Sequence, residues 1–177
     1  YFEETKEQIA SGRLASPILK SKWVYAQHTD SSFADKASFK KGLVLKQKPR
    51  SALLQLMGDT YVKLYINGTY VDKVFARRSL SLLVEYKRVN MIDISSFLKE
   101  GKNTIEVECR NYNTKGAAGF NIIAQIKSDD GVMELMSDES WEISDNKANL
   151  LKAVSKAYSN EVIQPNFSSG RPSWIER

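Results

Sequence analysis

Cysteine and histidine are nearly absent from this sequence, which has one of each in 177 residues, Cys109 and His28. A single cysteine cannot form an internal disulfide, and Cys109 shares the apolar side of an alternating run with Ile105 and Val107, which predicts a buried thiol. A Ser-His-Asp or Cys-His catalytic arrangement would have to recruit His28, which is distant in sequence from Cys109. The sequence therefore argues against nucleophilic catalysis, and without a Cys/His cluster it offers no zinc site.

Long hydrophobic runs and glycine-rich loops are also missing. No apolar stretch approaches the roughly 20 residues that span a bilayer, so no membrane span is expected. The segment GAAG at 116–119 lacks the following helix that a dinucleotide site needs. Neighbouring carboxylates occur at 129–130 and 138–139, but they belong to predicted turns, where adjacent side chains point apart. We interpret these pairs as turn-forming residues and not as an acid–base pair.

The charge and length of the chain are those of an ordinary globular domain. Lysine and arginine number 26 against 21 aspartate and glutamate, which gives a net charge of +5. The basic residues are scattered, which favours a solvated surface over a nucleic-acid footprint. A chain of this length buries about 70% of its unfolded surface, so one domain is expected. Because the chain begins at Tyr1 without a methionine or a signal-like segment, we expect it to be an internal piece of a longer, processed protein.

A clear alternating pattern is present between positions 61 and 112. In YVKLYI at 61–66, the Val, Leu and Ile side chains fall on one side of the chain and the Tyr, Lys and Tyr side chains on the other. This period of two is typical of a half-buried strand. The Asn67-Gly68 dipeptide that follows predicts a type I′ hairpin turn, because both central residues of that turn need positive φ.

Similar patterns along the chain predict an all-β fold, a β-sandwich or a barrel. Strands are expected at 23–27, 39–45, 52–57, 61–66, 70–75, 81–86, 89–92, 104–111, 120–127 and 132–136, with a hairpin turn at 129–131. Asp93 predicts the N-cap of one helical turn at 93–98. Leu150, Leu151, Val154 and Tyr158 have helical spacing and predict a packed helix at 146–158. The predicted organisation is a lead-in segment at 1–20, a sandwich domain at 21–158 and an irregular tail or linker at 159–177.

Two motifs carry a resemblance to a known family. The run YING at 65–68, followed by DISSFLKEGKNTIEV at 93–107, resembles the "lyvNG … diT..lk.GkN.i.v" pattern of galactose-binding-like jelly rolls, which are accessory domains of glycoside hydrolases. The DDG at 129–131 with SDESW at 137–141 is similar to the "DG … tD.sW" ending of sandwich domains in α-L-rhamnosidase-type enzymes. The two matches span about residues 50 to 145.

The resemblance implies a non-catalytic domain of a secreted or periplasmic glycoside hydrolase, docked beside the catalytic domain of the same chain. In such enzymes the acid and nucleophile carboxylates come from a separate barrel, which 177 strand-rich residues cannot form. The implied function is binding of an oligo- or polysaccharide; the alternative is a structural domain that braces the catalytic module. Jelly rolls of this kind often hold a structural calcium, but no EF-hand-like ligand string assigns one here.

The candidate sugar site combines aromatic rings with hydrogen-bonding groups. A sugar presents C–H bonds on one face and hydroxyls at its rim, so a site needs an aromatic platform beside polar side chains. The segment Arg110-Asn111-Tyr112-Asn113 supplies both at the end of a strand, and Arg77 and Tyr86 lie in a second region of predicted loops. Solvated loops are the alternative in both regions. For the remaining aromatic candidates, Trp23, Tyr25 and Trp141, core packing is favoured. A basic nucleic-acid-binding sandwich is the least favoured function.

Overall fold

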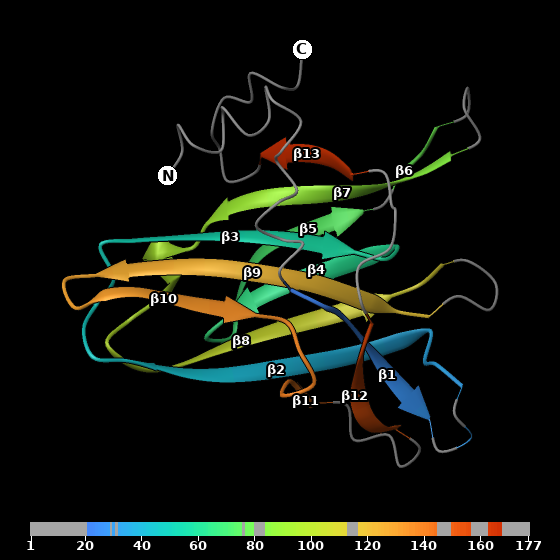
Figure 1. Cartoon of the computed structure of the whole chain (residues 1–177), viewed down its shortest axis with the longest axis horizontal. Coiled ribbons are helices and arrows are strands. Elements are labelled where there is room, and N and C mark those ends of the chain that lie inside the picture. The colour runs from blue at the N-terminus through green and yellow to red at the C-terminus, as the bar shows by residue number, and fades with distance from the viewer. Residues whose placement is uncertain are drawn as a thin grey trace.

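The computed structural model describes residues 21–28, 30, 32–75, 77–79, 84–112, 117–144, 150–156 and 163–167. Its strands form two sheets, and most strands of both run along the long axis of the molecule (Figure 1). The larger sheet has the order β12 (Leu150–Lys156), β1 (Trp23–His28), β9 (Gly119–Ser128), β3 (Ser51–Gly58), β7 (Val84–Asp93) and β13 (Ile163–Phe167), with β10 (Gly131–Met136) on β9 and β6 (Arg77–Ser79) on β7. The smaller sheet has the order β11 (Glu142–Ile143), β2 (Lys36–Leu45), β8 (Gly101–Arg110), β4 (Tyr61–Ile66) and β5 (Thr69–Phe75). The predicted all-β sandwich is confirmed.

The core lies between the two sheets and follows the period of two. On β4 the buried residues are Val62, Leu64 and Ile66, as predicted, and their neighbours Tyr61 and Lys63 point outward. The core also holds the β8 residues Ile105, Val107 and Cys109, the β3 residues Leu54 and Leu56, and Ile122 on β9. Burial of each large side chain contributes about 1.5–3 kcal/mol, which makes this interlayer the main source of stability.

The first of the two family-like motifs, at 65–68 and 93–107, forms a set of interlocked turns. Asn67 and Gly68 have φ of 52° and 77°, so the predicted positive-φ turn is confirmed. The amide of Asn67 donates to the side-chain oxygen of Asn103 at 2.9 Å and to the carbonyl of Phe97 at 2.9 Å. Buried Asn103 in turn donates to the carbonyl of Lys99 at 2.7 Å. The motif thus fastens the β4–β5 hairpin to the turn before β8.

A short 3-10 helix, η2 (Ser95–Phe97), confirms the predicted helical turn. The N-cap position is occupied by Ile94 and not by Asp93. The carboxylate of Asp93 still stabilises the turn, because it accepts hydrogen bonds from the N–H of Ser95 at 3.0 Å and from its hydroxyl at 2.6 Å.

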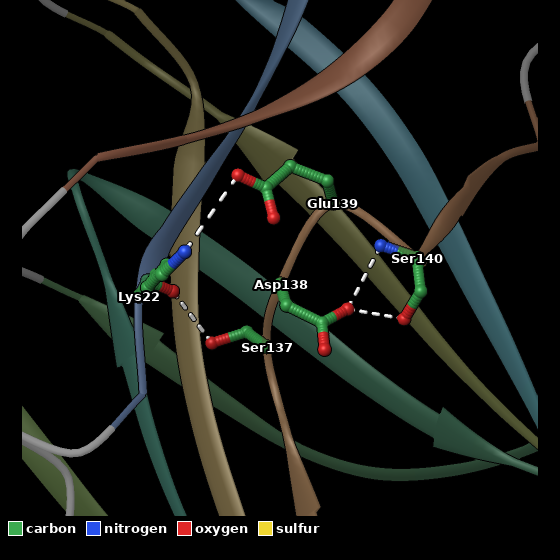
Figure 2. A network of polar contacts seen from close by, with 5 residues as sticks. All are labelled: Lys22, Ser137, Asp138, Glu139 and Ser140. Atoms are coloured by element: carbon green, nitrogen blue, oxygen red, sulfur yellow. Dashed lines mark hydrogen bonds and ion pairs between the residues drawn. The ribbon is translucent and has the colours of Figure 1, made fainter.

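The second motif fastens the segment after β10 to Lys22, the residue before β1 (Figure 2). The Ser137 hydroxyl donates to the carbonyl of Lys22 at 2.6 Å, and the Asp138 carboxylate accepts hydrogen bonds from the N–H and hydroxyl of Ser140. The indole N–H of Trp141 donates to the carbonyl of Met136 at 3.0 Å. Its ring packs against Phe120 in the core, with 4.9 Å between the centroids. This motif therefore serves the fold.

Two predictions for the C-terminal quarter are wrong. Residues 150–156, expected in the helix at 146–158, form strand β12, which pairs antiparallel with β1. Residues 163–167, expected in an irregular tail at 159–177, form strand β13, which pairs parallel with β7. Pro165 lacks an N–H group, and β13 tolerates it because an edge strand pairs on one side alone. The predicted lead-in at 1–20 lies outside the described residues.

Candidate functional site

The outward face of the smaller sheet carries a regular array of aromatic and charged side chains. Because alternate residues of each strand point away from the core, cross-strand partners form rows across β2, β8, β4 and β5. The row at one end contains Lys36, Arg110, Tyr61 and Phe75, and the next row contains Ser38, Glu108, Lys63 and Lys73. At this end β5 and β8 finish and β2 and β4 begin.

Three aromatic rings form a cluster at this end, which we call the three-ring cluster: Tyr61, Phe75 and Tyr112. The Tyr61 ring lies between the other two, with centroids 4.5 Å from Phe75 and 5.9 Å from Tyr112. Phe75 is 43% exposed and Tyr112 57% exposed. Strands β4 and β5 and the residues after β8 therefore bring together aromatic surface that is open to solvent.

Each ring of the cluster has a cation nearby. The guanidinium carbon of Arg110 lies 5.0 Å from the Tyr112 centroid, and the ammonium groups of Lys73 and Lys63 lie 5.6 Å from Phe75 and 6.0 Å from Tyr61. At exposed sites such cation–π contacts contribute about 0.5–1 kcal/mol each. They hold the long basic side chains close to the rings, so hydrogen-bond donors surround the aromatic surface.

A second aromatic pair extends the array along β4 and β5. Tyr65 and Tyr70 meet edge to face with centroids 5.8 Å apart, and the Tyr65 hydroxyl donates to the Glu108 carboxylate at 3.4 Å. Partial burial and the charge of Glu108 raise the pKa of Tyr65, so its hydroxyl remains a donor at neutral pH. Electrostatic interaction with the neighbouring Tyr61 and Tyr65 side chains raises the pKa of Lys63, which remains a cation.

Part of the predicted sugar site lies at this same end of the sheet. Arg110 and Tyr112 are exposed and in contact, as part of the array just described. Asn111 is 8% exposed, and its amide donates to the carbonyl of Ala117 at 2.7 Å, so it holds the loop together and does not face solvent. Arg77 and Tyr86 are cross-strand partners on the ribbon of β6 and β7, which projects from the sandwich (Figure 1). Asn113 lies outside the described residues.

The other aromatic candidates are buried, as predicted. Trp23 is 2%, Tyr25 8% and Trp141 2% exposed. Gly119 is needed beside Tyr25, because a Cβ at that position would clash with the tyrosine ring. These rings are therefore closed to a ligand in this structure.

Sequence reasoning missed Tyr61, Phe75, Lys63 and Lys73 as site residues. A signal for Tyr61 and Lys63 was present, because the period of two already placed both on the outward side of β4. The pairing of Tyr61 with Phe75 depends on an irregular register between β4 and β5, in which Val71 is an extra residue.

An exposed apolar surface lies at the opposite end of the sandwich. Val44 at the end of β2 is 63% exposed, and on the edge strand β10 Val132 is 58% and Met133 43% exposed. A pocket of about 230 Å³ opens between these strands and includes Leu45 and Ile126 in its lining. We call Val44, Val132 and Met133 the apolar end patch.

Metal and membrane features are absent from the part of the chain that the structure describes. Within it, no group of three or more His, Cys, Asp or Glu residues is placed to hold a metal ion. No helix among the described residues has the length and hydropathy to cross a membrane.

The sandwich is similar in fold to parts of several solved proteins. It matches an α-L-rhamnosidase from Dictyoglumus thermophilum over 83% of this chain and 22% of the enzyme, with 18% identity and a TM-score of 0.65. It matches an α-L-rhamnosidase from Aspergillus terreus over 81% of this chain and 22% of the enzyme, with 17% identity and a TM-score of 0.62. A lectin from Pleurotus ostreatus, solved in complex with GalNAc, matches over 71% of this chain and 35% of the lectin, with 22% identity and a TM-score of 0.53.

These likenesses confirm the resemblance to the β-sandwich accessory domains of α-L-rhamnosidases. The chain spans about a fifth of the length of the rhamnosidases that it matches. No family model and no curated protein matches the sequence. At identities this low the likeness establishes the fold alone, so any ligand must be argued from this chain's own residues.

Proposed function

We propose that this chain is a non-catalytic carbohydrate-binding domain of a larger glycoside hydrolase of the α-L-rhamnosidase type, and that its fold is a galactose-binding-like jelly roll. The observation that carries the proposal is the three-ring cluster, an exposed aromatic surface surrounded by hydrogen-bonding side chains. The shared fold with rhamnosidases and a GalNAc-bound lectin supports it.

The array matches the two-sided chemistry of a sugar ring. The C–H face of a pyranose packs on an aromatic ring, and desolvation of both surfaces stabilises the contact. Arg110 and Lys73 supply donors for the hydroxyl groups, and the carboxylate of Glu108 supplies an acceptor. Apart from Tyr112, the cluster lies on the paired strands β4 and β5, so most of the surface is formed before the ligand arrives and little ordering cost is added on binding.

The chain is expected to bind sugar without cleaving it. Hydrolysis would belong to a catalytic domain elsewhere in the same polypeptide, which is the proposed protein partner. The parent enzyme would act on polysaccharide outside the cytoplasm, as a secreted or periplasmic protein.

Titration calorimetry against rhamnose-, galactose- and glucuronate-containing oligosaccharides tests this function. We expect saturable binding to at least one glycan and a loss of about tenfold in affinity for Tyr112→Ala, which corresponds to about 1.4 kcal/mol. Val132→Ala, which truncates an exposed side chain of the apolar end patch, is the matched control and should leave affinity unchanged. No binding to any glycan of the panel, or equal affinity of both variants, would contradict the proposal.

The apolar end patch favours a second function, in which the domain braces the catalytic module. Exposed apolar surface at Val44, Val132 and Met133 is suited to burial against a neighbouring domain. Met133→Glu in the parent enzyme should then lower its melting temperature, whereas Lys73→Glu, on exposed β5 surface at the other end of the sandwich, should not. An unchanged melting temperature for Met133→Glu would argue against bracing through this patch.

A further inference from the structure

The end of the sheet that carries the three-ring cluster has a concentration of positive charge. Lys36 lies directly opposite Arg110, and Lys63 lies directly opposite Lys73. Rows on a sheet face are about 6.6 Å apart and strands about 4.8 Å apart, so the four cations occupy an area about 7 Å by 15 Å. Like charges directly opposite each other destabilise an antiparallel pair. Stability of the fold does not explain the presence of two like-charged pairs in adjacent rows.

Carboxylates among the described residues do not balance this charge. Glu108 is the one carboxylate in the two rows. The ion pairs found within the described residues are Lys22–Glu139, Lys40–Glu142 and Arg50–Asp129, and none includes the four cations. Further along the same face the arrangement differs, because Lys40 lies opposite Glu106 and 3.6 Å from Glu142. Among the described residues of this face, the excess positive charge is therefore greatest at the end that carries the rings.

We propose that the three-ring cluster and its four surrounding cations, Lys36, Lys63, Lys73 and Arg110, bind an acidic glycan that carries carboxylate groups. This inference rests on the proposed sugar-binding function and specifies the ligand class. A uronate residue offers a C–H face to a ring and a carboxylate to the adjacent ammonium or guanidinium group. Charge-assisted hydrogen bonds from these cations are stronger than those to a neutral hydroxyl, and Arg110 is able to bind a carboxylate through two parallel N–H donors.

Matched acidic and neutral ligands separate this inference from the proposed function. The probes are oligosaccharides of galacturonate, glucuronate and mannuronate, each tested as the free acid and as its methyl ester, together with a neutral glycan panel and single-stranded DNA. Esterification keeps the sugar ring and removes the charge. We expect an acid to bind at least about ten times more tightly than its ester, with affinity that falls as salt rises.

Substitutions test whether the preference for the acid over its ester arises from the cations on this face. Lys73→Gln and Arg110→Gln should each weaken binding of the acid about three- to fivefold and leave binding of the ester nearly unchanged. Lys102→Gln is the control, because it removes the same charge from an exposed position at the other end of β8. An equal effect of all three variants would indicate a long-range charge effect and would contradict the assigned site.

The remaining outcomes are equally decisive. Equal affinity for acid and ester, or binding confined to the neutral panel, would overturn the acidic ligand and leave the sugar-binding function intact. No binding to any acid, ester or neutral glycan would overturn both the acidic ligand and the sugar-binding function. Binding of single-stranded DNA more tightly than any uronate would overturn the glycan, because bases also stack on aromatic rings beside cations.

Discussion

At the residue scale, Cys109 shows how burial changes the chemistry of a side chain. The thiol is 1% exposed on β8, and desolvation, aided by the nearby charges of Asp59 and Glu108, raises its pKa well above the usual 9.0. The folded protein should therefore resist thiol reagents at pH 8, and full reaction should appear only in denaturant. Rapid modification of the native protein would contradict this placement.

The raised pKa of Cys109 also makes the free energy of unfolding depend on pH. Above pH 9.0 the unfolded thiol ionises while the native thiol keeps its proton, so the unfolded state binds fewer protons and the free energy of unfolding falls as pH rises. Urea denaturation between pH 8 and 10.5 should show a steeper loss of stability for the native sequence than for Cys109→Ala.

Asp138 makes the free energy of unfolding depend on pH in the opposite direction, because its contribution is lost as pH falls. Burial would raise its pKa, but the two hydrogen bonds from Ser140 and the charges of Lys41 and Lys22 lower the pKa below the usual 3.8. The unfolded state therefore takes up a proton first as pH falls, and the stabilisation that is complete well above pH 3.8 is lost through the folded pKa. Ser140→Ala should shift acid unfolding to higher pH, whereas Ser144→Ala, the same truncation at an exposed position outside this network, should not. Identical acid transitions for the two variants would be inconsistent with this role.

At the element scale, the paired turns after β4 and before β8 depend on one buried amide. The Asn103 side chain donates to the carbonyls of Lys99 and Gly101, and it accepts from the Lys99 N–H and the Asn67 amide. Asn103→Ala would leave buried backbone groups without partners, so we expect a loss of about 1–3 kcal/mol in the free energy of unfolding by urea. Lys102→Ala, on the exposed neighbour, should change it by less than about 0.5 kcal/mol. A small effect of Asn103→Ala would show that the interlocked turns contribute little.

The sequence predicted the strands and turns that are determined by residues close together in the chain. Strands β1 to β5 and β8 to β10 follow alternation and turn chemistry, and the Asn67-Gly68 turn follows from the φ that it requires. Strand β12 was missed because leucines and alanines favour helix, whereas pairing with β1 supplies partners that no local pattern reveals. Pro165 indicated a tail because sequence alone does not show that β13 is an edge strand.

The candidate site was predictable in part for the same reason. Arg110 and Tyr112 are close in the chain, and their combination was visible from sequence. A regular two-residue hairpin would pair Tyr65 with Tyr70, as observed, but it would not pair Tyr61 with Phe75. The extra residue at Val71 shifts the register and brings those two rings together, and nothing in the sequence fixes the position of such a bulge.

At the scale of the whole molecule, the two ends of the sandwich differ in chemistry. One end of the smaller sheet presents aromatic rings and cations, and the other end of the molecule presents the apolar end patch. A domain of this kind could hold a glycan at one end while its other end packs against a catalytic module. The two proposed functions therefore concern separate surfaces and are separable by mutation.

The most direct test of sugar binding by the three-ring cluster is a titration of isotope-labelled protein with the glycan panel, followed by amide and aromatic chemical shifts in nuclear magnetic resonance spectra. We predict that the largest shifts fall on Tyr61, Lys73, Phe75, Arg110 and Tyr112, with Val132 and Met133 unaffected. Shifts centred on the apolar end patch, or no shifts with any glycan, would contradict the claim that this face binds carbohydrate.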